Sequence, residues 1–200
     1  VTVDEMRNFA FAYVEKYAPS KQQLKTYLLK KYLKISLPNV KKQDVNNLID
    51  IVLSDLEKNR FINDKFYSET KAKSMIRRGN SINKIRSYLI GKGIEDNFIK
   101  ETVNKIQDEN SDQDFFSAIK VCKKKRIGPA RIDDNRSLFY KKDISLLARN
   151  GFDFETSKKV MDLKKEDYLK ITKLLWLFVF FDFYQVVNFI FNVIFDKNKY

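Results

Sequence analysis

The chain has 200 residues, 44% of them hydrophobic, which is enough to bury the core of one domain or of a short array of small units. Its 39 Lys and Arg against 26 Asp and Glu give a formal charge of +13, and this excess favours an acidic or phosphate-rich partner. Because histidine is absent, the sequence excludes Ser-His-Asp and Cys-His catalysis, histidine general bases and most catalytic zinc sites.

The first 60 residues predict three helices in series. Pro19 ends the first helix, and Ser20 with Gln23 forms a capping box that starts the second. A polar loop around Pro38 precedes the third helix. The apolar residues that share one face of each helix are Met6, Phe9, Ala10, Tyr13, Val14 and Tyr17, then Leu24, Tyr27 and Leu28, then Val45, Leu48, Ile49, Val52 and Leu56.

Residues 61–110 repeat this plan. The first helix of the block starts near Asn63 and breaks at residues 77–79. Ser81 caps the second helix, which closes at residues 91–93, where glycine can take the left-handed conformation. The apolar positions are Phe66, Tyr67, Met75 and Ile76, then Ile82, Ile85 and Leu89, then Ile99, Val103 and Ile106.

Residues 111–165 form a third block with the same plan. A break at residues 128–129 ends its first helix, and an insertion, Ile132–Tyr140, precedes a second helix that ends at residues 150–151. The apolar positions are Phe115, Phe116, Ile119 and Cys122, then Ile144, Leu147 and Ala148, then Val160, Met161 and Leu163.

The three blocks can be laid over one another. FYS at residues 66–68 matches FFS at residues 115–117, and GNS at residues 79–81 matches APS at residues 18–20. Because three short helices bury little alone, we expect an all-α fold of tandem three-helix, helix-turn-helix-like repeats that share their cores in an elongated, curved stack. A compact helical bundle is the alternative.

Several stretches resemble one family in their order and spacing. These are RFINDKFY at residues 60–67, the helix from Ile82 that ends in KGI at residues 92–94, KKKRIGPAR at residues 123–131 and LARNGF at residues 147–152. They are similar to the central and closing blocks of the RecX family, and the resemblance covers about Phe9 to Leu163. The spacing before Phe66 is one residue tighter than the family pattern, so the start of that helix stays open.

The resemblance implies a protein that binds the RecA filament on single-stranded DNA, lodges in its helical groove and suppresses ATPase activity and strand exchange. It implies no enzyme activity, no bound cofactor or metal and no small-molecule substrate. The residues expected to contact the filament are basic side chains in two clusters, because their long stems can reach phosphates or acidic protein patches. The first cluster is Lys71, Lys73, Arg77, Arg78, Lys84, Arg86 and Lys92, and the second is Lys123, Lys124, Lys125, Arg126 and Arg131. Solvated lysines that only complement a helix dipole are the alternative for each residue.

Other chemistry-bearing residues favour structural roles. The aromatic residues on apolar faces, such as Phe9 and Phe66, are expected to pack in the core rather than stack on bases. The aspartate pairs at residues 112 and 114 and at residues 133 and 134 could hold magnesium, but their positions favour capping and turns. Cys122 cannot form an internal disulfide and indicates a packed thiol in a reducing, cytoplasmic compartment.

Residues 166–200 form an apolar extension that the resemblance does not cover. The run from Leu174 to Phe195 is long enough to span a bilayer, but Asp182 near its middle makes a clean span costly. We expect an extra helix that covers the last repeat, and membrane contact by this tail is the less favoured possibility. Two other functions stay open: sequence-independent DNA binding without RecA contact, and membrane association through the tail.

Overall fold

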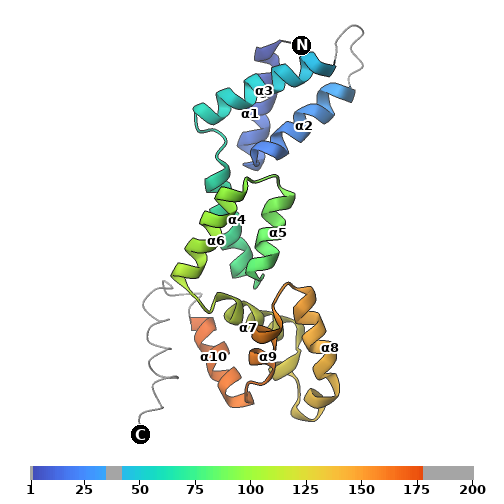
Figure 1. The fold of residues 1–200 in the computed structure, drawn as a ribbon, viewed down its shortest axis with the longest axis vertical. Coiled ribbons are helices and arrows are strands. Elements are labelled where there is room, and N and C mark those ends of the chain that lie inside the picture. The colour runs from blue at the N-terminus through green and yellow to red at the C-terminus, as the bar shows by residue number, and fades with distance from the viewer. Residues whose placement is uncertain (1, 35–41, 178–200) are drawn as a thin grey trace. The chain divides into compact units, whose positions relative to one another are not determined.

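The computed structural model describes residues 2–34 and 42–177, and every regular element in these ranges is helical (Figure 1). The predicted all-α class is therefore confirmed. The elements are α1 (Val3–Tyr17), α2 (Lys21–Lys34), α3 (Lys42–Lys58), α4 (Asp64–Arg77), α5 (Ile82–Gly91), α6 (Asp96–Glu109), α7 (Gln113–Lys125), the 3-10 turns η1 (Gly128–Ala130) and η2 (Asp133–Asn135), α8 (Arg136–Arg149), α9 (Phe154–Met161) and α10 (Lys165–Leu177).

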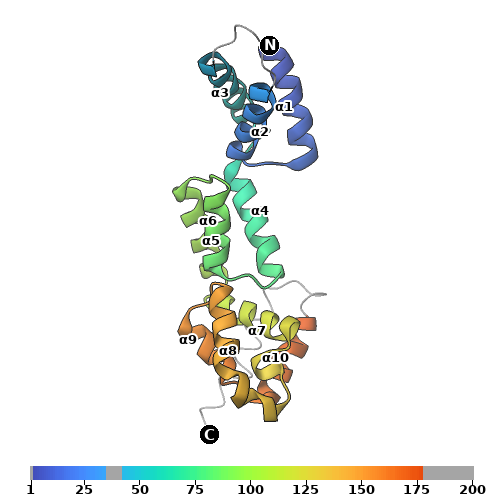
Figure 2. The ribbon, with the colours of Figure 1, turned by 90° about the vertical axis from the view of Figure 1, so that its right-hand side faces the viewer.

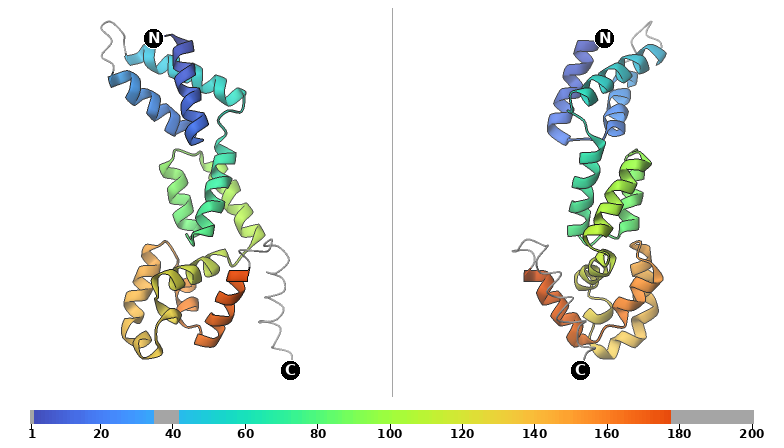
Figure 3. Two further views of the ribbon diagram at one scale, coloured as in Figure 1. Left: turned by 180° about the vertical axis from the view of Figure 1, so that it is seen from behind. Right: turned by 60° about the vertical axis from the view of Figure 1, so that its left-hand side comes forward.

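The chain divides into two compact units, Val1–Asp114 and Phe115–Tyr200. In the first unit, α1, α2 and α3 pack together, and α4, α5 and α6 lie side by side as a second group (Figure 2). In the second unit, α8 packs on α9, and both α9 and α10 contact η1 (Figure 3). The buried hydrophobic residues of the described ranges form three separate clusters, whereas we expected neighbouring repeats to share their cores. Most members of each cluster come from one sequence block, but Ile62 joins the first cluster, and Tyr168 and Ile171 join the third. The repeat bounds 1–60, 61–110 and 111–165 remain our proposal.

The helix ends of the first unit follow from local capping chemistry. Ser20 and Gln23 form the predicted capping box of α2, since the Gln23 N–H donates to Ser20 Oγ at 3.2 Å and the Ser20 N–H donates to Gln23 Oε1 at 3.1 Å. Asn63 caps α4 through the Phe66 N–H at 2.9 Å, which settles where that helix begins. Ser81 caps α5 in the same way, and Gly93 follows α5 with φ of +71°.

Three hydrogen bonds connect helices that are far apart in the sequence. The Ser20 hydroxyl donates to the Lys92 carbonyl at 2.8 Å, and the Lys21 N–H donates to Asp64 Oδ1 at 2.8 Å. These two bonds join the first repeat to the second. The Ile82 N–H donates to Asp114 Oδ1 at 2.8 Å in the same manner. The first backbone N–H groups of a helix have no partner within the helix. In both cases an aspartate at the start of one repeat accepts a hydrogen bond from such an N–H group in the repeat before it.

Three aromatics predicted on apolar helix faces are exposed, which corrects the sequence analysis. Phe66 is 68% exposed, Tyr17 is 54% exposed and Phe9 is 44% exposed. Tyr67, the neighbour of Phe66, is the residue that enters the core, and adjacent helical positions point about 100° apart, so both rings cannot face inward. Phe9 instead lies beneath the Lys31 ammonium group, whose Nζ is 3.1 Å from the ring centroid.

The expected insertion in the third block is also shorter than predicted. Only residues 133–135 form a separate 3-10 turn, and α8 already begins at Arg136. The Arg136 guanidinium donates to the carbonyls of Met161 and Leu163 at 2.9 and 2.7 Å, which holds the start of α8 against the end of α9. Ala148, predicted to lie on the apolar face of this helix, is exposed.

The last described helix belongs to the second unit. Tyr168 and Ile171 of α10 are buried in the cluster that also holds Phe116 and Cys122. The remainder of the predicted apolar extension, residues 178–200, lies outside the described residues. Among the helices that the structure does describe, none is long and apolar enough to cross a membrane.

Candidate functional site

The first basic cluster is divided between two sides of α4. Lys73 and Arg77 are four residues apart and share the exposed side of the helix. Lys71 and Arg78 are seven residues, about two turns, apart and share the other side, where Arg78 is exposed as well. Lys71 is half-buried with its ammonium group 5.4 Å from the Tyr67 ring centroid, and Arg78 donates to Ser74 Oγ at 2.7 Å. The basic residues of α4 therefore differ in their surroundings: Lys73 and Arg77 face solvent, whereas Lys71 and Arg78 contact side chains of their own helix.

The remaining members of this cluster extend along α5. Lys84 and Arg86 are exposed but two residues apart, which places them on nearly opposite sides of the helix. Lys92 caps the C-terminus of α5, and its ammonium group lies 5.3 Å from the centroid of the Tyr88 ring. Its carbonyl accepts a hydrogen bond from the Ser20 hydroxyl, so Lys92 belongs to the joint between the first two repeats.

Charge in the second repeat is segregated by helix. Residues 64–93 contain eight Lys and Arg against two Asp and Glu, whereas residues 94–114 contain two against seven. Ion pairs connect the two groups across α4 and α6, with Lys65 Nζ 2.7 Å from Glu101 Oε2 and Lys105 Nζ 3.2 Å from Glu69 Oε2. The basic residues outside these pairs concentrate positive potential on α4 and α5.

The second basic cluster lies at the C-terminal end of α7. Lys123, Lys124 and Lys125 form its last turn, and Arg126 follows in a left-handed backbone conformation with φ of +55°. All four side chains are exposed. The helix dipole favours cations at a helix C-terminus, so these positive charges stabilise the end of α7. Their exposed side chains can also contact a partner.

Arg131 is separated from this cluster by an internal ion pair. Its guanidinium donates to both oxygens of Asp143, with Nε 2.6 Å from Oδ2 and Nη2 2.8 Å from Oδ1. Asp143 is 1% exposed and also accepts the Gly128 N–H at 2.8 Å. Burial alone would raise the pKa of Asp143, but these hydrogen bonds and the Arg131 charge outweigh it and hold the pKa below its ordinary value. Arg131 thus holds η1 and α8 together.

Comparison with known proteins places the chain in a family. No family model matches it. The chain is 31% identical over 163 residues to the regulatory protein RecX of Myxococcus xanthus (strain DK1622), an alignment that covers 78% of this chain and 84% of that protein. The chain belongs to the RecX family. The crystal structure of a regulatory protein RecX matches it with a TM-score of 0.57 and 18% identity, over 80% of this chain and 74% of that one, and this likeness concerns the fold.

In this RecX-family chain the described Cys122 thiol is buried, as the sequence predicts. Its side chain is fully covered, and burial together with the charge of Asp143 raises its pKa to about 12. We therefore expect thiol reagents such as DTNB to leave the native protein unmodified at pH 8 and to modify one thiol per chain after denaturation in guanidinium. Rapid modification of the native protein would show that Cys122 is accessible.

The structure also brings together tyrosines within each of the first two repeats. The sequence predicts Tyr13, Tyr17, Tyr27 and Tyr67 on apolar helix faces and does not single out Tyr88. In the first repeat the Tyr13 ring lies against the rings of Tyr17 and Tyr27, and in the second repeat the hydroxyl groups of Tyr67 and Tyr88 are 3.4 Å apart. Periodicity could not show that residues from different helices meet.

Proposed function

We propose that this RecX-family protein binds the RecA filament on single-stranded DNA in the cytoplasm and inhibits its ATPase activity and strand exchange by contact. The observation that carries the proposal is the 31% identity to a regulatory protein RecX over most of both chains. Exposed basic clusters at the ends of α4 and α7, the first helices of two successive repeats, support it. A polymeric target offers repeated acidic or phosphate groups that such repeated clusters can contact.

The proposed contact residues are the exposed members of the two clusters. Long, solvated side chains at helix ends can reach phosphates without disturbing the core. Arg131 is left out because its guanidinium is engaged by Asp143. The proposed contacts are Lys73, Arg77, Arg78, Lys84, Arg86, Lys123, Lys124, Lys125 and Arg126.

Reversing charge in both clusters tests this surface. We expect the variant with Arg77, Arg78, Lys124 and Arg126 all replaced by glutamate to need at least about tenfold more protein for half-maximal inhibition of the RecA ATPase, because attraction becomes repulsion at four positions. The helices should persist, since all four side chains are exposed. Steady-state ATPase titration and circular dichroism measure the two effects.

A matched variant separates the clusters from net charge. Glutamate at four other exposed positions, Lys141, Arg149, Lys158 and Lys164, changes the net charge equally but leaves both clusters intact. We expect this variant to inhibit almost as well as the wild type. Equal potency of the two variants and the wild type would exclude the proposed surface.

Sequence-independent DNA binding without RecA is the second candidate, and the charge of +13 favours it. Binding through phosphates alone weakens steeply with salt, by a logarithmic slope of about −0.7 for each phosphate contacted on a single strand. We expect capture of the protein by RecA-coated DNA to persist at salt concentrations that abolish capture by bare DNA. Identical salt dependence in the two pull-downs would favour the DNA-binding alternative.

A further inference from the structure

Five helices of the described chain end in the same hydrogen-bonded turn, in which a backbone N–H just past the helix donates to the carbonyl five residues earlier. The donor and acceptor pairs are Phe61 and Leu56, Asn80 and Met75, Ile94 and Leu89, Ile127 and Cys122, and Phe152 and Leu147. The residue just before the donor takes a left-handed conformation, which favours glycine because other residues have a Cβ atom that crowds the backbone. Three of these turns have glycine there, at residues 79, 93 and 151, whereas two have arginine, at residues 60 and 126.

Arginine is strained in this position. Arg60 has φ of +61° and Arg126 has φ of +55°, in the region where a side chain raises the energy of the backbone. Neither side chain offsets this strain inside the chain. Both are exposed, and neither pairs with a carboxylate among the described residues, whereas Arg131 pairs with Asp143. A strained residue whose side chain the fold does not use indicates a role in contacts outside the fold.

The surroundings of Arg60 favour a protein partner. Arg126 follows three lysines, but residues 55–64 carry two basic and three acidic side chains, so this stretch has no excess of positive charge to attract a phosphate backbone. Phe61, the next residue, is 51% exposed, and the Phe11 ring supports it edge-on with the ring centroids 4.6 Å apart. An arginine beside a supported aromatic ring is typical of the centre of a protein–protein interface.

We propose that Arg60 and Phe61 form a protein-binding site on the first repeat. The Arg60 guanidinium pairs with a carboxylate of the partner, and the Phe61 ring packs against an apolar side chain beside that carboxylate. The site rests on the proposed function, in which the protein partner is RecA in the filament, and it adds a contact outside both basic clusters. The chain keeps arginine at residue 60, although glycine would be more stable there, because the side chain binds the partner.

Thermal unfolding without RecA tests the strain at residue 60. We expect Arg60→Gly to raise the midpoint of unfolding of the first unit by about 4 °C, because glycine takes the left-handed conformation freely. Asn59→Gly is the matched control at the same helix end. Asn59 does not have a positive φ, and its Nδ2 donates to the Asp55 carbonyl at 2.8 Å, so this variant should lower the midpoint. An unchanged or lower midpoint for Arg60→Gly would overturn the inference.

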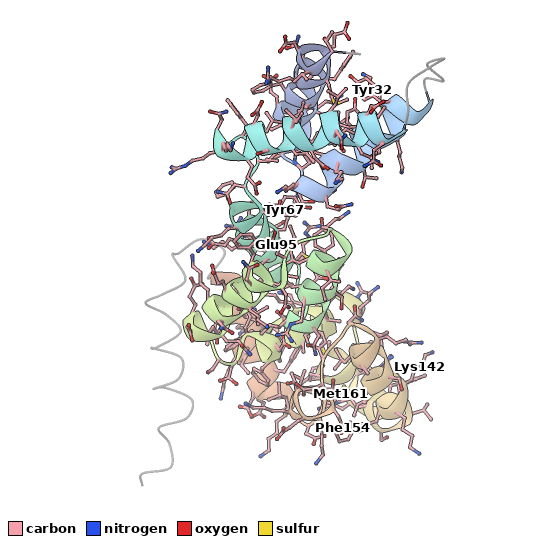
Figure 4. All side chains as sticks on the ribbon, turned by 45° about the horizontal axis from the view of Figure 1, so that its top comes forward. Tyr32, Tyr67, Glu95, Lys142, Phe154 and Met161 are labelled. Atoms are coloured by element: carbon pink, nitrogen blue, oxygen red, sulfur yellow. The ribbon has the colours of Figure 1, made fainter. Side chains whose placement is uncertain are left out.

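Inhibition of the RecA ATPase on single-stranded DNA tests the contact itself. We expect Arg60→Gly and Phe61→Ala each to need at least about fivefold more protein for half-maximal inhibition, the lower limit for a residue at the centre of an interface. Arg149→Ala and Phe154→Ala are the matched controls. Both side chains are exposed in the second unit, where Figure 4 shows Phe154 at the surface, and these variants should inhibit as the wild type does.

The wild type in the same titration separates the possible failures. A wild type that inhibits RecA together with an equally potent Arg60→Gly protein would overturn the site and leave the proposed function intact. A wild type without inhibition would contradict the proposed function and the site with it. The loss for Arg60→Gly should also be confined to capture by RecA-coated DNA, and an equal loss on bare single-stranded DNA would make Arg60 a phosphate contact and overturn the protein site.

Discussion

Replacing Asp143 with alanine is expected to lower the free energy of unfolding of the second unit by about 3 kcal/mol. The substitution removes the partner of the Arg131 guanidinium and leaves the buried Gly128 N–H without its acceptor. Because Asp143 is the buried member of the pair and Arg131 is 23% exposed, most of the cost arises from the buried Gly128 N–H that loses its acceptor and from the lost charge-assisted hydrogen bonds. Urea denaturation, monitored with hydrogen exchange to resolve the two units, measures the loss.

Asp133→Ala is the control for this substitution. Asp133 forms an ion pair with Arg136 at 3.9 Å, but its side chain is 70% exposed, so we expect a change within about 0.5 kcal/mol. A loss for Asp143→Ala as small as that for Asp133→Ala would show that the buried network does not stabilise the unit.

The same network makes stability depend on acid pH. The pKa of Asp143 is lower in the folded chain than its ordinary value, so the ionised carboxylate favours folding. This contribution is complete above the unfolded pKa of about 4 and is lost as the pH falls through the folded pKa. We expect the unfolding free energy of the wild type to fall more steeply below about pH 4 than that of Asp143→Asn. Parallel pH profiles would contradict this assignment.

Gly93→Ala is expected to destabilise the first unit by about 2 kcal/mol. Gly93 has φ of +71°, where a side chain is strained, and a Cβ there would lie 2.5 Å from Gln22 Cβ across the joint between the repeats. Thermal unfolding of the variant measures the cost.

Gly91→Ala is the control because the two glycines lie only two residues apart. Apart from its chain neighbours and the backbone of its own helix, a Cβ at Gly91 would meet no described atom within 4 Å, and Gly91 is the last residue of α5. We expect no loss of stability there, and a gain of up to about 1 kcal/mol, since alanine favours helix. If both variants unfold like the wild type, the close approach of Gly93 and Gln22 does not contribute to stability.

The sequence predicted what local chemistry controls. The capping residues Ser20, Asn63 and Ser81 act on groups within three residues, so the sequence identified the helix starts at Ser20 and Ser81. The start near Asn63 stayed open until the structure showed its cap. The capping of one helix by Asp64 or Asp114 from the following repeat was not predictable, because the partners are 43 and 32 residues apart. Where two adjacent residues are apolar, periodicity does not decide which of them faces the core. Phe66 is exposed and Tyr67 is buried, although both were predicted to be core residues.

The candidate site was predictable in charge and unpredictable in geometry. The sequence identified the basic residues of α4, α5 and α7. It could not show that Arg131 pairs with Asp143 or that Lys92 lies over the Tyr88 ring, because these contacts depend on the fold. A single sequence records neither of these two contacts.

The most direct test is the rate of ATP hydrolysis by RecA on single-stranded DNA, titrated with the purified full-length chain. Regulation of the filament predicts a rate that falls progressively and reaches a plateau as the protein saturates its binding sites. A rate that stays constant in severalfold molar excess of folded protein would contradict regulation of the RecA filament.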